Sequence, residues 1–99
     1  MNKIRYKFKA KLWKYSASKG SWHFVKLPKE LSDEIRENSG WLEEGWGRLK
    51  VRATIRDITW DTSIWFDKKF KSYLLPIKSE IRVKTKMEIE EIAEFIIEV

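Results

Sequence analysis

Cysteine is absent from this sequence, and histidine occurs only once, as His23. Without cysteine there is no disulfide, no thiolate metal ligand and no cysteine nucleophile. A single histidine excludes a histidine pair on a metal, and its position inside a strand-like segment favours a solvent-facing side chain over a general base. We therefore expect no metal site, no cofactor and no catalytic residue, and we predict that the protein is not an enzyme.

Long apolar runs are also missing, because none approaches the about 20 residues of a membrane-spanning helix. Residues 1–5 are basic but lead into alternating charge, not into the apolar core of a signal peptide. We expect a cytoplasmic protein that makes no contact with a membrane. The 99 residues, of which 42% are hydrophobic and 36% charged, predict one folded domain over residues 1–99.

Proline occurs only at Pro28 and Pro76, which lie 48 positions apart. Each proline ends an apolar, strand-like run in a Leu-Pro pair and precedes a short charged amphipathic segment. Proline ends a sheet ladder because it has no N–H, and the same lack suits it to the first turn of a helix. The repeat predicts two strand–helix–strand halves related by a pseudo-twofold, folded as one small, mainly β barrel with two short helices.

The patterning between these landmarks places the remaining elements. Alternation or short β-branched and aromatic runs predict strands over residues 4–12, 21–27, 48–55, 58–66 and 73–75. We predict loops or turns at residues 16–20, 41–45, 56–57 and 67–69. Apolar residues four apart predict a helix after each proline, with Leu31 and Ile35 in the first and Ile77 and Ile81 in the second. The last residues fit a helical stripe or a strand, and their β-branched and aromatic content favours a strand from about Ile92.

Four phrases of the chain, taken in order, resemble the pattern of the domain-of-unknown-function family nineteen-oh-five. They are Phe-x-Ala-x-Leu, Gly-x-Trp-x-Phe-Val-x-Leu-Pro, Trp-x-Thr-Ser-Ile and Tyr-x-Leu-Pro-Ile-Lys with a later arginine. The residues that match are Phe8, Ala10, Leu12, Gly20, Trp22, Phe24, Val25, Leu27, Pro28, Trp60, Thr62, Ser63, Ile64, Tyr73, Leu75, Pro76, Ile77, Lys78 and Arg82. The resemblance covers nearly the whole chain.

The resemblance implies a small double-split β-barrel similar to the DNA-binding domains of AbrB and MazE, alone or joined to a YdeI-type domain. It implies no activity, because the family has no established one. Members place glycine in the middle hairpin turn and a Gly-Asp pair before the last strand, whereas this chain has Arg56-Asp57 and Glu90-Glu91. Because glycine serves where φ is positive, the geometry of both turns stays open at this point.

Basic residues fill one face of two predicted strands, and the net charge of the chain is +6. The first face carries Lys3, Arg5, Lys7, Lys9 and Lys11, and the second carries Arg48, Lys50, Arg52 and Arg56. We predict binding of nucleic acid or another polyanion, with these candidates: Lys7, Lys9, Lys11, Arg48, Lys50, Arg52 and Arg56. Like charges repel across strands, so we expect the two strands to be unpaired or to have an acidic strand nearby, for which Glu94 and Glu98 are candidates. The alternative is a solvated, ion-paired surface of the kind found in heat-adapted proteins.

Six tryptophans are a large number for this length. Trp22 and Trp60 occupy family-like positions, and we predict that both fill the barrel core. The others either cover the barrel ends and the helices or stack on a base or ring of a ligand; they are Trp13, Trp41, Trp46 and Trp65. A second candidate site is an anion pocket at the start of the second helix, formed by Thr62, Ser63, Tyr73, Lys78 and Arg82. The alternative is that these side chains satisfy turns, carbonyls and acids.

The function that the sequence favours is a non-enzymatic binding module for nucleic acid or another polyanion. One alternative is a protein-interaction or accessory domain, which predicts an exposed apolar patch. The other is a small-anion pocket at the second candidate site. The predicted partner is thus a polyanion or a protein, and the sequence is compatible with a monomer or a dimer.

Overall fold

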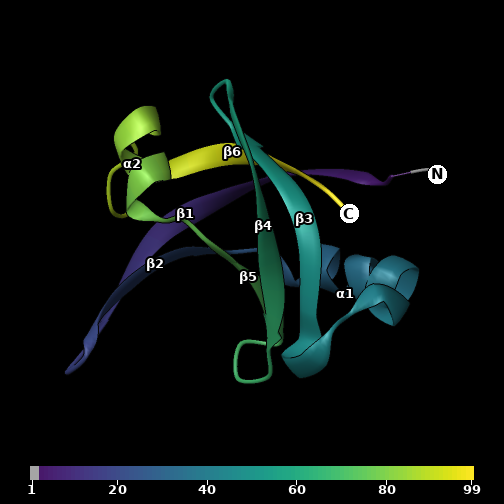
Figure 1. Ribbon diagram of the computed structural model, residues 1–99. Coiled ribbons are helices and arrows are strands. Elements are labelled where there is room, and N and C mark those ends of the chain that lie inside the picture. Colours follow the sequence, from purple (N-terminus) through teal and green to yellow (C-terminus); the bar gives the residue numbers. More distant parts are fainter. Residues whose placement is uncertain (1–2) are drawn as a thin grey trace.

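The computed structural model describes residues 3–99, apart from the side chain of Trp46. Its elements are β1 (Arg5–Ala17), β2 (Gly20–Lys26), α1 (Lys29–Ser39), β3 (Arg48–Ile55), β4 (Ile58–Asp67), β5 (Ser72–Pro76), α2 (Ser79–Thr85) and β6 (Ile92–Glu98). Two short 3-10 turns, η1 (Gly40–Leu42) and η2 (Gly45–Gly47), join α1 to β3. The strands form a closed antiparallel barrel in the order β1-β2-β5-β4-β3-β6, which confirms the predicted mainly β fold (Figure 1).

The two halves of the barrel, β1-β2-α1-β3 and β4-β5-α2-β6, have equivalent topology. Exchanging them turns the β1–β2 pair into β4–β5 and the β3–β4 pair into β6–β1. The β2–β5 and β3–β6 pairs are converted into themselves. Pro28 and Pro76 stand at equivalent points, each between a strand and a helix, and the two helices lie on opposite sides of the barrel in Figure 1. The predicted pseudo-twofold is therefore present in the strand pairing.

The inward side chains of the strands form one core, which also receives a residue from each helix. Ile35 of α1 and Ile81 of α2 are buried in it, as predicted. Ile77 is buried too, but it lies outside the helix predicted to contain it, because α2 begins only at Ser79. Trp60 packs against the core, but the prediction for Trp22 is wrong because 52% of its surface is exposed. Alternate residues of a strand face opposite sides, so the buried Val25 places Trp22 on the outside of β2.

The first hairpin is longer than predicted. Residues 16–20 do not form an open loop, because β1 continues to Ala17, which pairs with Gly20 at the start of β2. Gly20 has a φ of 139°, which L side chains rarely adopt, so a sharp return of the chain is possible here. Across the same hairpin the rings of Tyr15 and Trp22 are 6.0 Å apart between centroids, and this contact extends the pairing beyond the barrel.

Two turns that lack the family's glycines keep the backbone conformation that glycine favours. Arg56 and Asp57, between β3 and β4, have φ values of 47° and 68°. Positive φ at both central residues matches the twist of a two-residue hairpin. Glu90, before β6, has a φ of 70°. The chain thus holds left-handed conformations with ordinary side chains, at an energetic penalty of about 1–2 kcal/mol for each residue.

β6 lies between the two basic strands, pairing with β1 on one side and β3 on the other. Its Glu98 carboxylate is 3.9 Å from Arg5 Nε, and its Glu94 carboxylate is 3.9 Å from Lys7 Nζ. The expectation of an acidic strand beside the basic ones is confirmed. Between residues 3 and 99, no helix is both long and apolar enough to cross a membrane.

Candidate functional site

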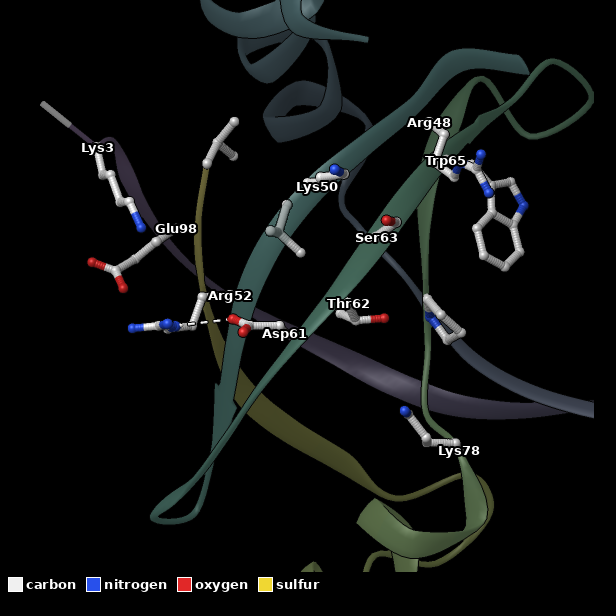
Figure 2. A pocket seen from close by; sticks show the side chains of 13 residues that line it. Lys3, Arg48, Lys50, Arg52, Asp61, Thr62, Ser63, Trp65, Lys78 and Glu98 are labelled. Atoms are coloured by element: carbon white, nitrogen blue, oxygen red, sulfur yellow. Dashed lines mark hydrogen bonds and ion pairs between the residues drawn. The ribbon is translucent and has the colours of Figure 1, made fainter. Parts of the chain in front are cut away.

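An open groove of about 880 Å³ crosses the outer face of β3 and β4, and we call it the basic groove. Cross-strand pairs on these strands supply much of its lining: Arg48 with Trp65, Lys50 with Ser63, and Arg52 with Asp61. Figure 2 shows Lys78 entering from the segment after β5, while Lys3 and Glu98 border the opposite side. Strands from both halves of the barrel therefore build this surface.

Positive charge exceeds negative charge in the described lining of the basic groove. Asp61 and Glu98 supply its two side-chain carboxylates, and its five cationic side chains are Lys3, Arg48, Lys50, Arg52 and Lys78. Arg52 Nε donates to Asp61 Oδ1 at 3.1 Å, and Lys50 Nζ lies 3.8 Å from a carboxylate oxygen of Glu44. These side chains are at least half exposed, and such ion pairs contribute about 0–1 kcal/mol. An incoming anion can therefore displace the carboxylates with little loss of stability.

The polyanion candidates from the sequence do not all gather here. Arg48, Lys50 and Arg52 line the basic groove, whereas three others lie on the outer side of β1 outside its lining: Lys7, Lys9 and Lys11. Arg56, at the hairpin between β3 and β4, donates from Nη1 to the main-chain oxygen of Thr85 at 2.5 Å. It also forms an ion pair with Glu91, so its guanidinium ties β3 to the turn before β6.

The anion pocket predicted at the second helix is only partly assembled. Thr62, Ser63 and Lys78 line the basic groove. Arg82 is not in that lining, and its Nη1 donates to the main-chain oxygen of Ile77 at 2.7 Å. The structure thus assigns to Arg82 the alternative role considered from the sequence, which is to satisfy a carbonyl.

Tyr73 also lies away from the groove, because its side chain faces inward and is fully buried. Its hydroxyl donates to the carboxylate of Glu43, which lies 3.7 Å from Arg36 Nε on α1. Burial raises the pKa of this hydroxyl far above its usual range, and the hydrogen bond and negative charge of Glu43 raise it further. Tyr73 therefore fastens α1 and the following turn to the barrel as a neutral phenol.

A second groove of about 480 Å³, which we call the aromatic groove, lies on the outer side of β2 and β5. Its aromatic lining consists of Tyr15, Trp22, Phe24, Trp65 and Phe70. Leu74 contributes to the same lining. Its neighbours Tyr73 and Leu75 point into the barrel, so Leu74 points outward, and yet it is only 6% exposed. A buried leucine outside the core shows that these rings form a separate apolar cluster.

The pattern that indicates this cluster lies in two whole strands of the sequence and not in single tryptophans. In β2 and β5 apolar residues occur on both faces: Phe24 lies outside beside the inward Val25, and Leu74 lies outside between the inward Tyr73 and Leu75. Continuous apolar strands are typical of sheets covered on both sides. No helix of the described chain covers this outer face, so the rings of the aromatic groove cover it in part and remain partly exposed.

His23 lines the aromatic groove and is partly buried, so it is less solvent-facing than predicted. Burial lowers its pKa below the usual value of 6.5, and the positive charges of Arg82 and Lys14 lower it further. The ring is therefore neutral at neutral pH, with one nitrogen that donates and one that accepts.

The two grooves are adjacent, because Trp65 and Pro76 line both. One surface, running from β3 across β4 to β5 and β2, thus changes from cationic and hydroxylic to aromatic.

Comparison with known proteins adds a family match: residues 8–96 match the family model described as "Domain of unknown function (DUF1905)". No curated protein matches the chain.

Proposed function

We propose that this chain, which belongs to the DUF1905 family, is a binding module for polyanions. In this proposal the basic groove holds the phosphates of a nucleic acid. The proposal rests on the site alone, because the description of the family assigns no function. The observation that carries the proposal is the cationic lining of that groove, in which Arg48 and Lys50 stand on one strand and Lys78 approaches from across β4. Such a lining neutralises successive phosphates and releases their counterions.

Hydroxyl side chains in the basic groove also support phosphate contact. Thr62 and Ser63 belong to the lining of the groove, and hydroxyls are common donors to phosphate oxygens. The double-split barrel of the AbrB and MazE kind that the family resemblance implies is compatible with this use of the fold. Fold alone does not fix function, so the proposal rests on the groove and not on that resemblance.

A salt titration of binding tests the proposal. The probes are inorganic polyphosphate and oligo(dT) of about 12 nucleotides, a length suited to small barrels. In one variant three groove cations are neutralised: Arg48→Gln, Lys50→Gln and Lys78→Gln. The matched control loses the same charge from β1: Lys7→Gln, Lys9→Gln and Lys11→Gln. Both variants have the same net charge, so a general charge effect weakens both equally.

We expect the groove variant to lose most of its affinity. The slope of log K against log salt should become shallower by about 2, because three cations are lost and each phosphate contact on a single strand contributes about 0.7. The control should keep most of its affinity and its slope. Equal losses in the two variants would show that net charge, and not the basic groove, attracts the ligand. Absence of salt-dependent binding in the unmodified protein would end the proposal.

A further inference from the structure

We infer that the aromatic groove binds the unpaired bases of a nucleic acid strand whose phosphates lie in the basic groove, so that the protein prefers single strands to duplexes. This inference rests on the proposed function and adds the class of nucleic acid. It follows from the adjacency of the two grooves, which share Trp65 and Pro76 in their linings.

The rings of the aromatic groove are accessible and held in place. Tyr15 is 59% exposed and Trp22 is 52% exposed, and they contact each other across the β1–β2 hairpin with ring centroids 6.0 Å apart. Trp65 is 38% exposed and stands beside Leu74, its cross-strand partner on β5. Rings on paired strands lose little freedom when a flat ligand stacks on them, and every base has a π-face suited to this contact.

The charges around these rings fit an anionic ligand. Lys69 lines the aromatic groove, and the Lys26 ammonium lies 4.5 Å from the ring centre of Phe70. The acidic residue in this lining is Asp67, whose Oδ1 accepts a hydrogen bond from the Phe70 main-chain N–H at 2.9 Å. With a net charge of +6, two copies of the chain repel each other. A nucleic acid strand satisfies both the rings and the surrounding lysines.

The arrangement also distinguishes strand types. In a duplex the bases stack on each other and face inward, so they cannot reach rings on the side of a sheet. In a single strand the bases turn out and stack on aromatic side chains while the backbone follows a positive groove. The volume of about 480 Å³ is within the range of about 300–1,000 Å³ that is usual for ligand pockets.

A tryptophan substitution with a matched control tests the inference. Trp22→Ala removes a ring on the outer side of β2, and Trp41→Ala removes a ring that is 80% exposed in η1 and lies outside both linings. Each variant is titrated with three probes: oligo(dT) of about 12 nucleotides, a duplex of equal length, and inorganic polyphosphate. Circular dichroism and the thermal midpoint establish that both variants are folded, and sedimentation reports self-association.

We expect Trp22→Ala to weaken oligo(dT) binding by roughly 5- to 150-fold, the loss of one stacked base, while binding of polyphosphate changes less than twofold. Trp41→Ala should leave all three affinities unchanged, and the unmodified protein should bind oligo(dT) more tightly than the duplex.

Three outcomes overturn the inference. If Trp22→Ala leaves oligo(dT) binding unchanged, or if the duplex binds as tightly as the single strand, the bases do not stack on the rings of the aromatic groove. Binding of phosphate by the basic groove is not affected by that result. If the protein self-associates and Trp22→Ala abolishes that association, the aromatic groove is a contact between copies. If polyphosphate itself fails to bind, the proposed function fails first, and this result is distinct from the other two.

Discussion

Arg48 on β3 and Trp65 on β4 are direct cross-strand partners, placed where the basic groove meets the aromatic groove. Directly opposed residues of an antiparallel pair have Cβ atoms about 4.5–5.5 Å apart. A cation suited to a phosphate and a ring suited to a base are therefore neighbours on one face of the barrel (Figure 2). We expect one nucleotide to contact both.

This relationship predicts that Arg48→Gln and Trp65→Ala affect binding of oligo(dT) in a coupled way. Each substitution should weaken binding. The binding free energy lost by the double variant should be smaller than the sum of the two single losses by at least about 0.5 kcal/mol, because the first substitution already displaces the shared nucleotide. Isothermal titration of the four proteins measures the coupling. As a control, Lys3→Gln and Trp22→Ala lie in different grooves and should add. Additive losses for Arg48 and Trp65 would contradict the shared contact.

The carboxylates of β6 predict a gain of affinity. Glu98 lines the basic groove and lies 3.9 Å from Arg5 Nε, whereas Glu94 pairs with Lys7 outside that lining. Glu98→Gln should raise the affinity for polyphosphate about fivefold at low salt, since a unit charge a few ångströms away contributes about 1 kcal/mol. Glu94→Gln makes the same change of charge on the same strand and should have a smaller effect. A larger gain from Glu94→Gln would place the ligand on β1 instead.

His23 predicts a dependence of stability on pH. Its pKa in the folded protein is lowered, chiefly by burial, so below the usual value of 6.5 the unfolded chain binds the proton more readily than the folded one. His23 therefore does not reduce the free energy of unfolding above pH 6.5, and it reduces this free energy as the pH falls below that value. Between about pH 7 and about pH 5, the thermal midpoint of the unmodified protein should fall more than that of His23→Gln. Parallel curves for the two proteins would contradict this prediction.

Glu90 predicts a stabilising substitution. Its φ of 70° is unfavourable for a side chain with a Cβ atom, and its N–H donates to the main-chain oxygen of Leu12 at 2.7 Å, a bond that glycine retains. Glu90→Gly should raise the free energy of unfolding by about 0.5–1 kcal/mol, because the relief of strain exceeds the added entropy of the unfolded chain. Urea titration measures the change. Glu88→Gly, in the same turn but without a positive φ, should give no gain.

Local patterns in the sequence were sufficient for the elements of this fold. Alternation located β1 and β3, and short β-branched and aromatic runs located the other strands. Each Leu-Pro pair marked the end of a strand before a helix, because a missing N–H acts on the chain at that point. The acidic strand beside the basic ones also followed from local charge, with Glu94 and Glu98 confirmed next to β1. These features depend on neighbours along the chain or on one face of one strand.

The site was harder to predict because it depends on which strands become neighbours. Trp22 was assigned to the core from its motif, although an odd separation of three positions from the inward Val25 places it on the outer face of β2. Tyr73 and Arg82 are close to Lys78 along the chain but point elsewhere, since one enters the core and the other bonds a carbonyl. The aromatic groove requires β5 to pair with both β4 and β2, and the β2–β5 pair joins strands that are remote along the chain.

The place of β6 in the ladder has a consequence for biosynthesis. This strand follows all the others along the chain, yet it joins β1 to β3, pairing Arg5 with Glu98 across almost the whole polypeptide. Such remote pairings form late and slowly, since a large loop must close before they are made. On the ribosome the barrel therefore stays open until Ile92–Glu98 has emerged, and until then β1 and β3 each present an unpaired edge.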